Sequence, residues 1–442
     1  MSYPHDSTQQ LLASEESHAP ALSYYQATAT EAAPPLAPLE GTVQTDVCIV
    51  GGGYTGLSAA LHLARSGVAV TLLEQHQVGS GASGRNGGQV HTGMRHDPEW
   101  FAQRLGAEAA HAYWALALKA RAYLDELIAH YQIDAQYCPG LLHALHRPRY
   151  LAEARAHVEQ HNQHFPGTPL RFIEREELRS LIATEDYHGA YLDGSSGHLH
   201  ALNLARGLAR AARAQGATLF EETRATRLER RGALWQVHTP RGAVQARRVL
   251  LAGNGYLAGL NADVQAHVMP LHNYIVTTEP LGRSGAEALI RNRLAVSDSR
   301  FVVYYFRITP DDRLLFGGGE TYTGKQPSDI RALVRPHLLR IFPQLAPVRL
   351  EHAWGGTLAV TPTRLPYVRE LATGLYNASG FSGLGVVLAP FTGKVMAEAL
   401  LGDDAALRLL AALPVPAFPG GALLRRPAVI AALSWCALLD RF

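Results

Sequence analysis

The hydrophobic pattern of residues 46–74 predicts a strand, a helix and a second strand in close succession. Residues 47–50 form a continuous apolar run, which is typical of a strand buried on both faces. Residues 57–64 place apolar side chains at helical spacing, and residues 68–73 form a second apolar run. We therefore predict a βαβ unit with two parallel strands.

Glycines fill the turn between the first strand and the helix. Gly51, Gly53 and Gly56 form the pattern G-x-G-x-x-G, and Glu74 follows about 20 residues later. Such a turn brings backbone N–H groups at a helix start close to a pyrophosphate, and the carboxylate can accept hydrogen bonds from ribose. This order predicts a dinucleotide site. The alternative is a glycine-rich turn in a fold that binds no nucleotide.

The same periodicities divide the rest of the chain into predicted elements. Helices are predicted at residues 98–132, 150–165, 174–178, 202–214, 327–342, 386–401 and 426–438. Strands are predicted at residues 141–146, 172–173, 190–192, 218–222, 234–238, 248–253, 274–278, 301–308, 314–317 and 350–354. Strands dominate between Met269 and Trp354, which predicts an antiparallel sheet interrupted by one helix.

We predict an α/β protein, α+β overall, in which a discontinuous Rossmann-type domain carries a second, antiparallel-sheet domain. The dinucleotide domain takes residues 41–97, 192–265 and 355–410, and the substrate domain takes residues 98–191 and 266–354. Residues 1–40 are an arm rich in Ala, Ser, Thr and Pro, whose Tyr24 and Tyr25 could dock on the folded body. Residues 411–442 form a tail with a terminal helix.

Two further glycine-rich segments extend the predicted site. The loop at residues 75–95 is long and has no predicted element, and residues 79–89 within it are rich in glycine. We therefore predict that its backbone contacts a flat cofactor; a mobile surface loop is the alternative. Residues 375–385 form a second strand-to-helix junction, which places another helix N-terminus near an electron-rich group. The strand ending at Gly253 is predicted to lie beside the same crevice.

The composition of the chain indicates which kinds of partner and cellular location to expect. The 442 residues are 47% hydrophobic and 18% charged, with a net charge of +2, so no nucleic-acid partner is predicted. Three distant cysteines make neither a disulfide framework nor a zinc pattern, so we predict no metal and a reducing, cytoplasmic location. No signal peptide is recognisable, and the apolar run at residues 428–439 is too short to span a bilayer.

Ten stretches together resemble one known superfamily. They are residues 23–25, 46–63, 81–89, 131–134, 197–200, 269–270, 277–280, 312–319, 342–345 and 418–421. The chain resembles flavin-dependent amine oxidases of the D-amino-acid oxidase, glycine oxidase and sarcosine oxidase superfamily, and most of all the bacterial γ-glutamylputrescine oxidases. The resemblance implies FAD as the cofactor. It also implies a small-molecule amine as the substrate and O2 as the electron acceptor.

The resemblance assigns the cofactor residues. Those of the first turn and the ribose are Gly51, Gly53, Tyr54, Thr55, Gly56, Glu74, Gln75 and Gly253. Those along the flavin are Ala82, Ser83, Gly84, Arg85, Asn86, Gly87, Gly88, Gln89, Gly380, Ser382, Gly383, Leu384, Gly385 and Val386.

Some positions depart from relatives. Leu384 stands where relatives often have histidine, so a polar contact there is lost. Asn86 stands at the loop position that carries a flavin-linking histidine in some members, and no cysteine lies between Cys138 and Cys436, so we predict non-covalent FAD. The strand at residues 313–317 lacks the lysine that activates oxygen in monomeric sarcosine oxidases.

The expected reaction is oxidation of an amine C–N bond to an imine, then to an aldehyde and ammonia, with O2 reduced to H2O2. We name no certain general base. Substrate-pocket candidates are Tyr305 and Arg307, which alternation puts on one face of a strand, and Trp354 at a strand end. Arg307 could bind the α-carboxylate of γ-glutamylputrescine; a solvent-facing arginine and a core tryptophan are the alternatives. The rival functions are a dehydrogenase that reduces a quinone or protein acceptor, and a non-catalytic flavin-binding redox sensor.

Overall fold

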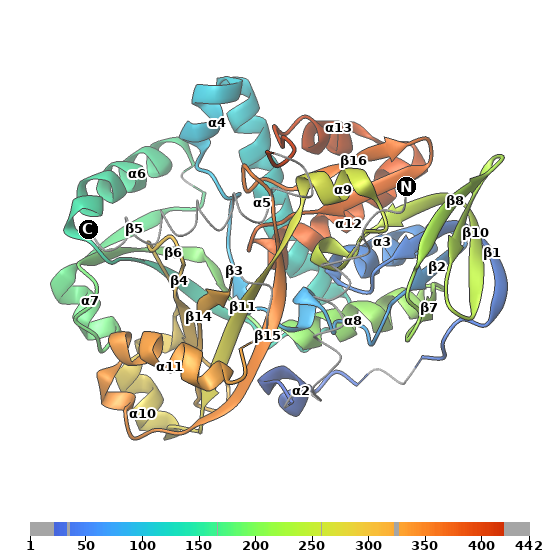
Figure 1. Cartoon of the computed structure of the whole chain (residues 1–442). Coiled ribbons are helices and arrows are strands. Elements are labelled where there is room, and N and C mark those ends of the chain that lie inside the picture. The colour runs from blue at the N-terminus through green and yellow to red at the C-terminus, as the bar shows by residue number, and fades with distance from the viewer. Residues whose placement is uncertain (1–21, 33–35, 166, 258, 322–326, 420–442) are drawn as a thin grey trace.

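The computed structural model describes residues 22–32, 36–165, 167–257, 259–321 and 327–419. The terminal helix predicted at residues 426–438 lies outside these ranges. Within them the chain forms two sheets, which lie on opposite sides of the molecule in Figure 1. No helix of the described ranges combines the length and the apolar character needed to cross a bilayer.

The first sheet is the predicted dinucleotide-binding sheet. Its strands run in the order β16 (Tyr367–Ala372), β17 (Leu375–Ser379), β10 (Gly242–Leu251), β1 (Gly41–Val50), β2 (Val70–Leu73) and β7 (Thr218–Phe220). From β17 to β7 the neighbours are parallel, and β16 is antiparallel to β17. A hairpin of β8 (Arg227–Arg231) and β9 (Leu234–His238) continues from β10. The parallel βαβ unit is therefore confirmed.

Helices of four different chain segments share the core of this sheet. They are α3 (Tyr54–Arg65), α5 (Ala107–His130), α8 (Ala201–Ala214) and α12 (Gly385–Leu401), with α4 (Pro98–Leu105), α9 (Ala262–His267) and α13 (Ala405–Ala411) nearby. The helix predicted at residues 98–132 is in fact two, because Gly106 has φ +91 between them. Leu116 and Leu124 of α5 are buried in the same core as Leu57 of α3. This helical segment was predicted to belong to the substrate domain, whereas its apolar side chains lie in the core of the first sheet.

The second sheet is mainly antiparallel. Its strands run in the order β15 (Leu350–Val360), β11 (Met269–Thr278), β14 (Leu314–Thr321), β13 (Tyr305–Ile308), β12 (Ala295–Asp298), β4 (Cys138–Leu145), β6 (Gly189–His198) and β3 (Gln89–Val90), and β5 (Leu170–Glu174) pairs with β6. The helices around it are α6 (Leu151–His164), α7 (Arg175–Leu181), α10 (Gly282–Leu289) and α11 (Ile330–Ile341). The β12–β4 pair is parallel, so the antiparallel prediction fails at the junction of the two chain segments.

Two predicted domain boundaries fall inside continuous strands. β6 crosses the boundary predicted between residues 191 and 192, and β15 crosses the one between residues 354 and 355. Both strands run on through glycines beyond the ends that were predicted at residues 192 and 354. The ladder hydrogen bonds to β4 and β11 hold these glycine-containing segments extended.

The N-terminal arm is packed at the seam between the two sheets. α2 (Tyr24–Thr28) begins with a capping box between Ser23 and Gln26. Tyr24 and Tyr25 are buried and share a small core with residues of α8 and of the second sheet, which are Ala201, Leu202, Ile275, Leu315 and Trp354. The suggested docking of the two tyrosines is therefore confirmed.

Candidate cofactor and substrate site

The turn between β1 and α3 leaves no space for side chains. Gly51 has φ +116, and a Cβ there would lie 2.7 Å from the carbonyl oxygen of Ala252. A Cβ at Gly56 would lie 2.0 Å from the oxygen of Gly51. The N-cap of α3, Gly53, offers no side-chain acceptor, so the positive end of the helix is left for an external anion.

Glu74 lies at the end of β2 beside this turn. One carboxylate oxygen accepts the N–H of Gly52 at 2.7 Å and the other accepts the N–H of His76 at 2.9 Å. Burial raises the pKa of Glu74, and these two hydrogen bonds oppose the rise. Each carboxylate oxygen has a second lone pair, so the group can still accept from ribose hydroxyls. Gln75 follows it and is half-buried.

The glycine-rich loop is compact. It contains a 3₁₀ turn at Ala82–Gly84, and Ser83 Oγ accepts the N–H of Tyr54 at 2.9 Å, which ties the loop to the start of α3. The Asn86 amide donates to the carbonyls of Ala82 and Ser83, and its oxygen accepts the N–H of Gly88. Asn86 therefore shapes the loop through the loop's own backbone.

Two of the three substrate-pocket candidates anchor this loop from the second sheet. Arg307 is 2% exposed and donates from Nε to the carbonyl of Gly87 at 2.9 Å. Trp354 is 1% exposed and donates from Nε1 to the carbonyl of Arg85 at 3.0 Å. Neither side chain lines the cavity described below. The structure thus places Arg307 in the interior and not at the solvent-facing position weighed as its alternative.

Tyr305 lies between two glycines. A Cβ at Gly87 would lie 2.5 Å from its ring, and a Cβ at Gly317 would lie 2.0 Å from it. Its hydroxyl donates to Asn273 Oδ1. Tyr305 lines the cavity and Arg307 does not, although both belong to β13. The difference arises because neighbouring chain segments cover Arg307 but not Tyr305.

The second glycine-rich junction stands at the start of α12. The N–H of Gly380 donates to Asn254 Oδ1 at 2.9 Å, and Ser382 takes a positive φ of +50 with its N–H on the carbonyl of Ala359. The N-cap of α12, Leu384, offers no side-chain acceptor. This site therefore has two uncapped helix N-termini, one at each glycine-rich turn. Gly253 lies against the first turn, since its N lies 2.8 Å from a Cβ built on Gly51.

One cavity of about 710 Å³ joins the loop, the second junction and the second sheet. The predicted site residues that line it are Ala82, Arg85, Asn86, Gly87, Gln89, Tyr305, Ser382, Gly383, Leu384 and Val386. The predicted residues of the first turn do not line it. Its volume is in the usual range for small-molecule sites. The predicted cofactor residues therefore fall into a tight half around the first turn and an open half around the cavity.

The sequence interpretation missed a wall of aromatic residues in this cavity. His91, His143, His157 and His161 line it together with Tyr191, and the rings of His143 and Tyr191 stack at 4.5 Å. Burial lowers the pKa of His91 to about 3 and that of His143 to about 4, so both are neutral at pH 7. The i, i+4 spacing of His157 and His161 on a predicted helix was the one available signal.

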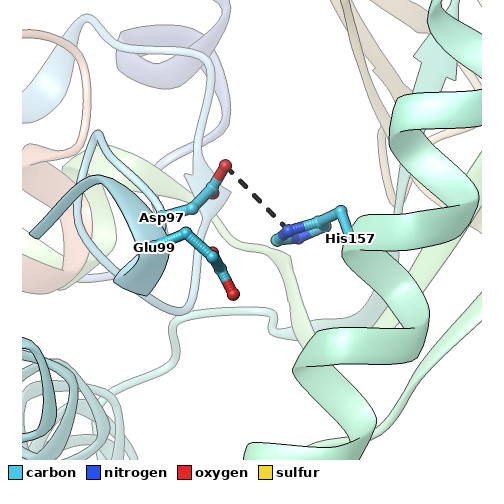
Figure 2. Close-up of side chains that lie close together, drawn as sticks. All are labelled: Asp97, Glu99 and His157. Carbon is cyan, nitrogen blue, oxygen red and sulfur yellow. Dashed lines mark ion pairs between the residues drawn. The ribbon is translucent and has the colours of Figure 1, made fainter. Parts of the chain in front are cut away.

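An acidic cluster lies at the edge of the cavity. Figure 2 shows Asp97 and Glu99 near His157, with His157 Nδ1 at 3.9 Å from Asp97 Oδ2. The three groups are close enough to share a metal ion. Exposed acids are common without one, however, and the cluster has no further feature of a metal site. The prediction of no metal therefore stays a prediction.

The family model named FAD dependent oxidoreductase, DAO, matches residues 46–399. The chain belongs to this family. The match spans both sheets and every glycine-rich segment of the site. The DAO-family fold, the enzyme class and FAD as the cofactor are thereby confirmed.

Curated relatives match nearly the whole chain. The probable oxidoreductase OrdL of Rhizobium meliloti (strain 1021) is 42% identical over 424 residues, which cover 96% of this chain and 98% of that protein. The gamma-glutamylputrescine oxidoreductase of Escherichia coli (strain K12) is 37% identical over 420 residues, which cover 95% of this chain and 98% of that protein. Glycine oxidase from Geobacillus kaustophilus superposes with a TM-score of 0.68 at 24% identity, covering 80% of this chain and 94% of its own, which shows the fold.

The residues of this chain fit FAD. The first turn brings backbone close to a pyrophosphate and presents an uncapped helix end. The second uncapped end, before Gly385, borders the cavity together with the loop at Arg85–Gly87. Positive helix ends stabilise negative charge, which suits a reduced flavin.

Proposed function

We propose that the protein oxidises the C–N bond of an amine, with γ-glutamylputrescine as the substrate, and that O2 accepts the electrons and becomes H2O2. The observation that carries the proposal is the 37% identity to a gamma-glutamylputrescine oxidoreductase over 95% of the chain. The cavity supports this proposal, because residues of the glycine-rich loop and of the second sheet line it together, and it is large enough for a small-molecule substrate.

FAD supplies the electron acceptor for the C–N oxidation. The chain's own residues position the reactants and tune the charge. The α12 N-terminus offsets negative charge that develops nearby, and the Arg307 and Trp354 hydrogen bonds fix the loop against which the amine is held. The neutral imidazoles of His91 and His143 can accept hydrogen bonds from an amine.

The proposed sequence balances without a further reactant. The amine R–CH2–NH2 loses two electrons and two protons and becomes the imine. Water then hydrolyses the imine to the aldehyde and ammonia. O2 takes the two electrons and two protons and becomes H2O2.

An anaerobic flavin-bleaching screen tests the substrate. The panel is γ-glutamylputrescine, other γ-glutamylpolyamines, putrescine, sarcosine, glycine and D-amino acids. We expect the fastest bleaching with γ-glutamylputrescine. Faster bleaching by glycine or sarcosine would assign another substrate, and no bleaching by any compound would favour the redox-sensor alternative.

Peroxide yield tests the electron acceptor. We expect one H2O2 for each aldehyde formed under air. Aldehyde formation that requires an added quinone, with little peroxide, would identify a dehydrogenase. This control matters because dimethylglycine dehydrogenase of Mus musculus is also similar, at 26% identity.

A further inference from the structure

Two arginines of the cavity have no acidic partner. Arg95 and Arg364 both line it, and within the described residues neither guanidinium makes an ion pair or a hydrogen bond. The Arg364 guanidinium lies over the ring of Phe301, 4.6 Å from its centroid. Arg300, in contrast, lines the same cavity but is bound to two aspartates. The cavity therefore holds two guanidinium groups that no acidic group of the described residues contacts.

A direct contact joins the segments that carry these arginines. The Nε2–H of His96 donates to the carbonyl of Thr363 at 2.8 Å, and these residues immediately neighbour Arg95 and Arg364. The His96 ring is stacked on Trp100 at 4.0 Å with an interplanar angle of 6°. This contact fixes two segments that lie more than 250 residues apart in the chain. The hydrogen bond between His96 and Thr363 thus joins the two segments from which Arg95 and Arg364 line the cavity.

The electrostatic surroundings of Arg95 favour a nearby anion. Desolvation by the surrounding protein is the first cause that lowers the pKa of Arg95 to about 10, although part of its side chain is exposed. The second cause of this lowered pKa is the charge of Arg364, and Asp97 opposes it only in part. A bound anion would relieve the repulsion between the two cations.

We propose that Arg95 and Arg364 bind a carboxylate of the amine substrate and select carboxylated acyl-amines over plain diamines. This rests on the proposed amine oxidation and deepens it, since γ-glutamylputrescine carries an α-carboxylate. Guanidinium groups match the two oxygens of a carboxylate with parallel N–H donors. Arg307, first considered for this role, has its Nε and Nη2 donors engaged with protein oxygens.

The decisive measurement is a specificity ratio. kcat/KM is measured on the holoenzyme for γ-glutamylputrescine and for the same compound with its α-carboxylate converted to a carboxamide. We expect Arg95→Gln and Arg364→Gln each to lower the carboxylate-to-carboxamide ratio about tenfold or more, and Arg364→Lys to retain part of it. Arg104→Gln is the matched control, because Arg104 also lies over an aromatic ring but outside the cavity, so the ratio should stay.

A binding measurement separates this proposal from the proposed substrate. Glutarate is titrated into each holoenzyme and the absorption change of the bound flavin is followed. Tight binding to the wild type that weakens about tenfold in both glutamine variants supports the carboxylate site even if γ-glutamylputrescine is not oxidised. An unchanged ratio in both variants, or glutarate affinity equal in wild type and variants, would overturn it.

Discussion

The two halves of this site differ in the space they leave. Around the β1–α3 turn, a single added Cβ at Gly51 or Gly56 would meet backbone at 2.7 or 2.0 Å. The other half holds a cavity of about 710 Å³ between the loop, α12 and the second sheet. The tight half, around the β1–α3 turn, suits the fixed shape that we predict for its ligand, a pyrophosphate. The cavity half can change its ligand when side chains change while the backbone stays.

The halves also differ in where their residues come from. The tight half is made mostly by one continuous segment of the chain, from β1 to Glu74. The open half brings together the loop at Arg85–Gly87, α6, β13 and the start of α12. Substitutions in the first half should therefore abolish cofactor binding, whereas substitutions in the second should alter selectivity.

The largest effect is expected at Gly56. Gly56→Val places a branched side chain against the Gly51 carbonyl, which must push α3 away from β1. We expect purified protein without bound flavin, measured by the ratio of absorbance at 450 and 280 nm. Gly67→Ala is the matched control, because no atom lies within 4 Å of the added Cβ. This variant should retain FAD. Its free energy of unfolding should fall by about 1 kcal/mol, because alanine is strained at the positive φ of this position. Flavin retained in Gly56→Val would contradict this view of the tight half.

Arg307→Ala should have the next largest effect. It removes the donors to the carbonyls of Gly87 and Leu199 and to the hydroxyl of Tyr25, all in the interior. Leaving buried acceptors unpaired should lower the free energy of unfolding by about 3 kcal/mol. Urea denaturation measures this loss. The carboxylate-to-carboxamide ratio should not change, and a selective loss of the carboxylated substrate would return Arg307 to the substrate site.

Acid should lower the free energy of unfolding through two buried histidines, His198 and His200. His198 and His200 are 3% and 2% exposed, and burial lowers the pKa of each to about 3. The unfolded chain binds protons on them below about pH 6.5 while the folded chain does not, so stability falls as pH decreases from 6.5. Each of these two histidines should lower the free energy of unfolding by about 2 kcal/mol when the pH falls from 7 to 5.

Urea denaturation at the two pH values measures this loss. In His198→Asn the drop from pH 7 to pH 5 should be about 2 kcal/mol smaller than in the wild type, since one titrating group is gone. An unchanged drop would mean that the pKa of His198 is the same in the folded and the unfolded chain.

Tyr305→Phe should have the smallest effect. It removes the hydroxyl that donates to Asn273 but keeps the ring between Gly87 and Gly317. We expect unchanged flavin content and a loss of about 1 kcal/mol in stability. Thermal unfolding, together with the absorbance ratio, checks both. A variant that loses its flavin would show that Asn273, not the ring, holds this side of the loop.

The sequence was sufficient for the parts of the fold that are local. The βαβ unit, its three glycines and Glu74 could be identified because strand period, helix period and turn chemistry act within 30 residues. The same holds for the second junction at Gly380–Gly385. The full extent of two strands could not be predicted locally. β6 and β15 run through glycines beyond the ends predicted at residues 192 and 354, because pairing with distant strands overrides local preference.

The tertiary structure alone decided which side chains reach the cavity. Tyr305 and Arg307 share a strand face, yet the first lines the cavity and the second is covered by Tyr25 of the arm and by the backbone at Gly87 and Leu199. Likewise, Arg95 and Arg364 line one cavity from two distant segments, which the hydrogen bond between His96 and Thr363 joins. Alternation fixes the face of a strand, but what lies over that face depends on segments hundreds of residues away, which no local pattern encodes.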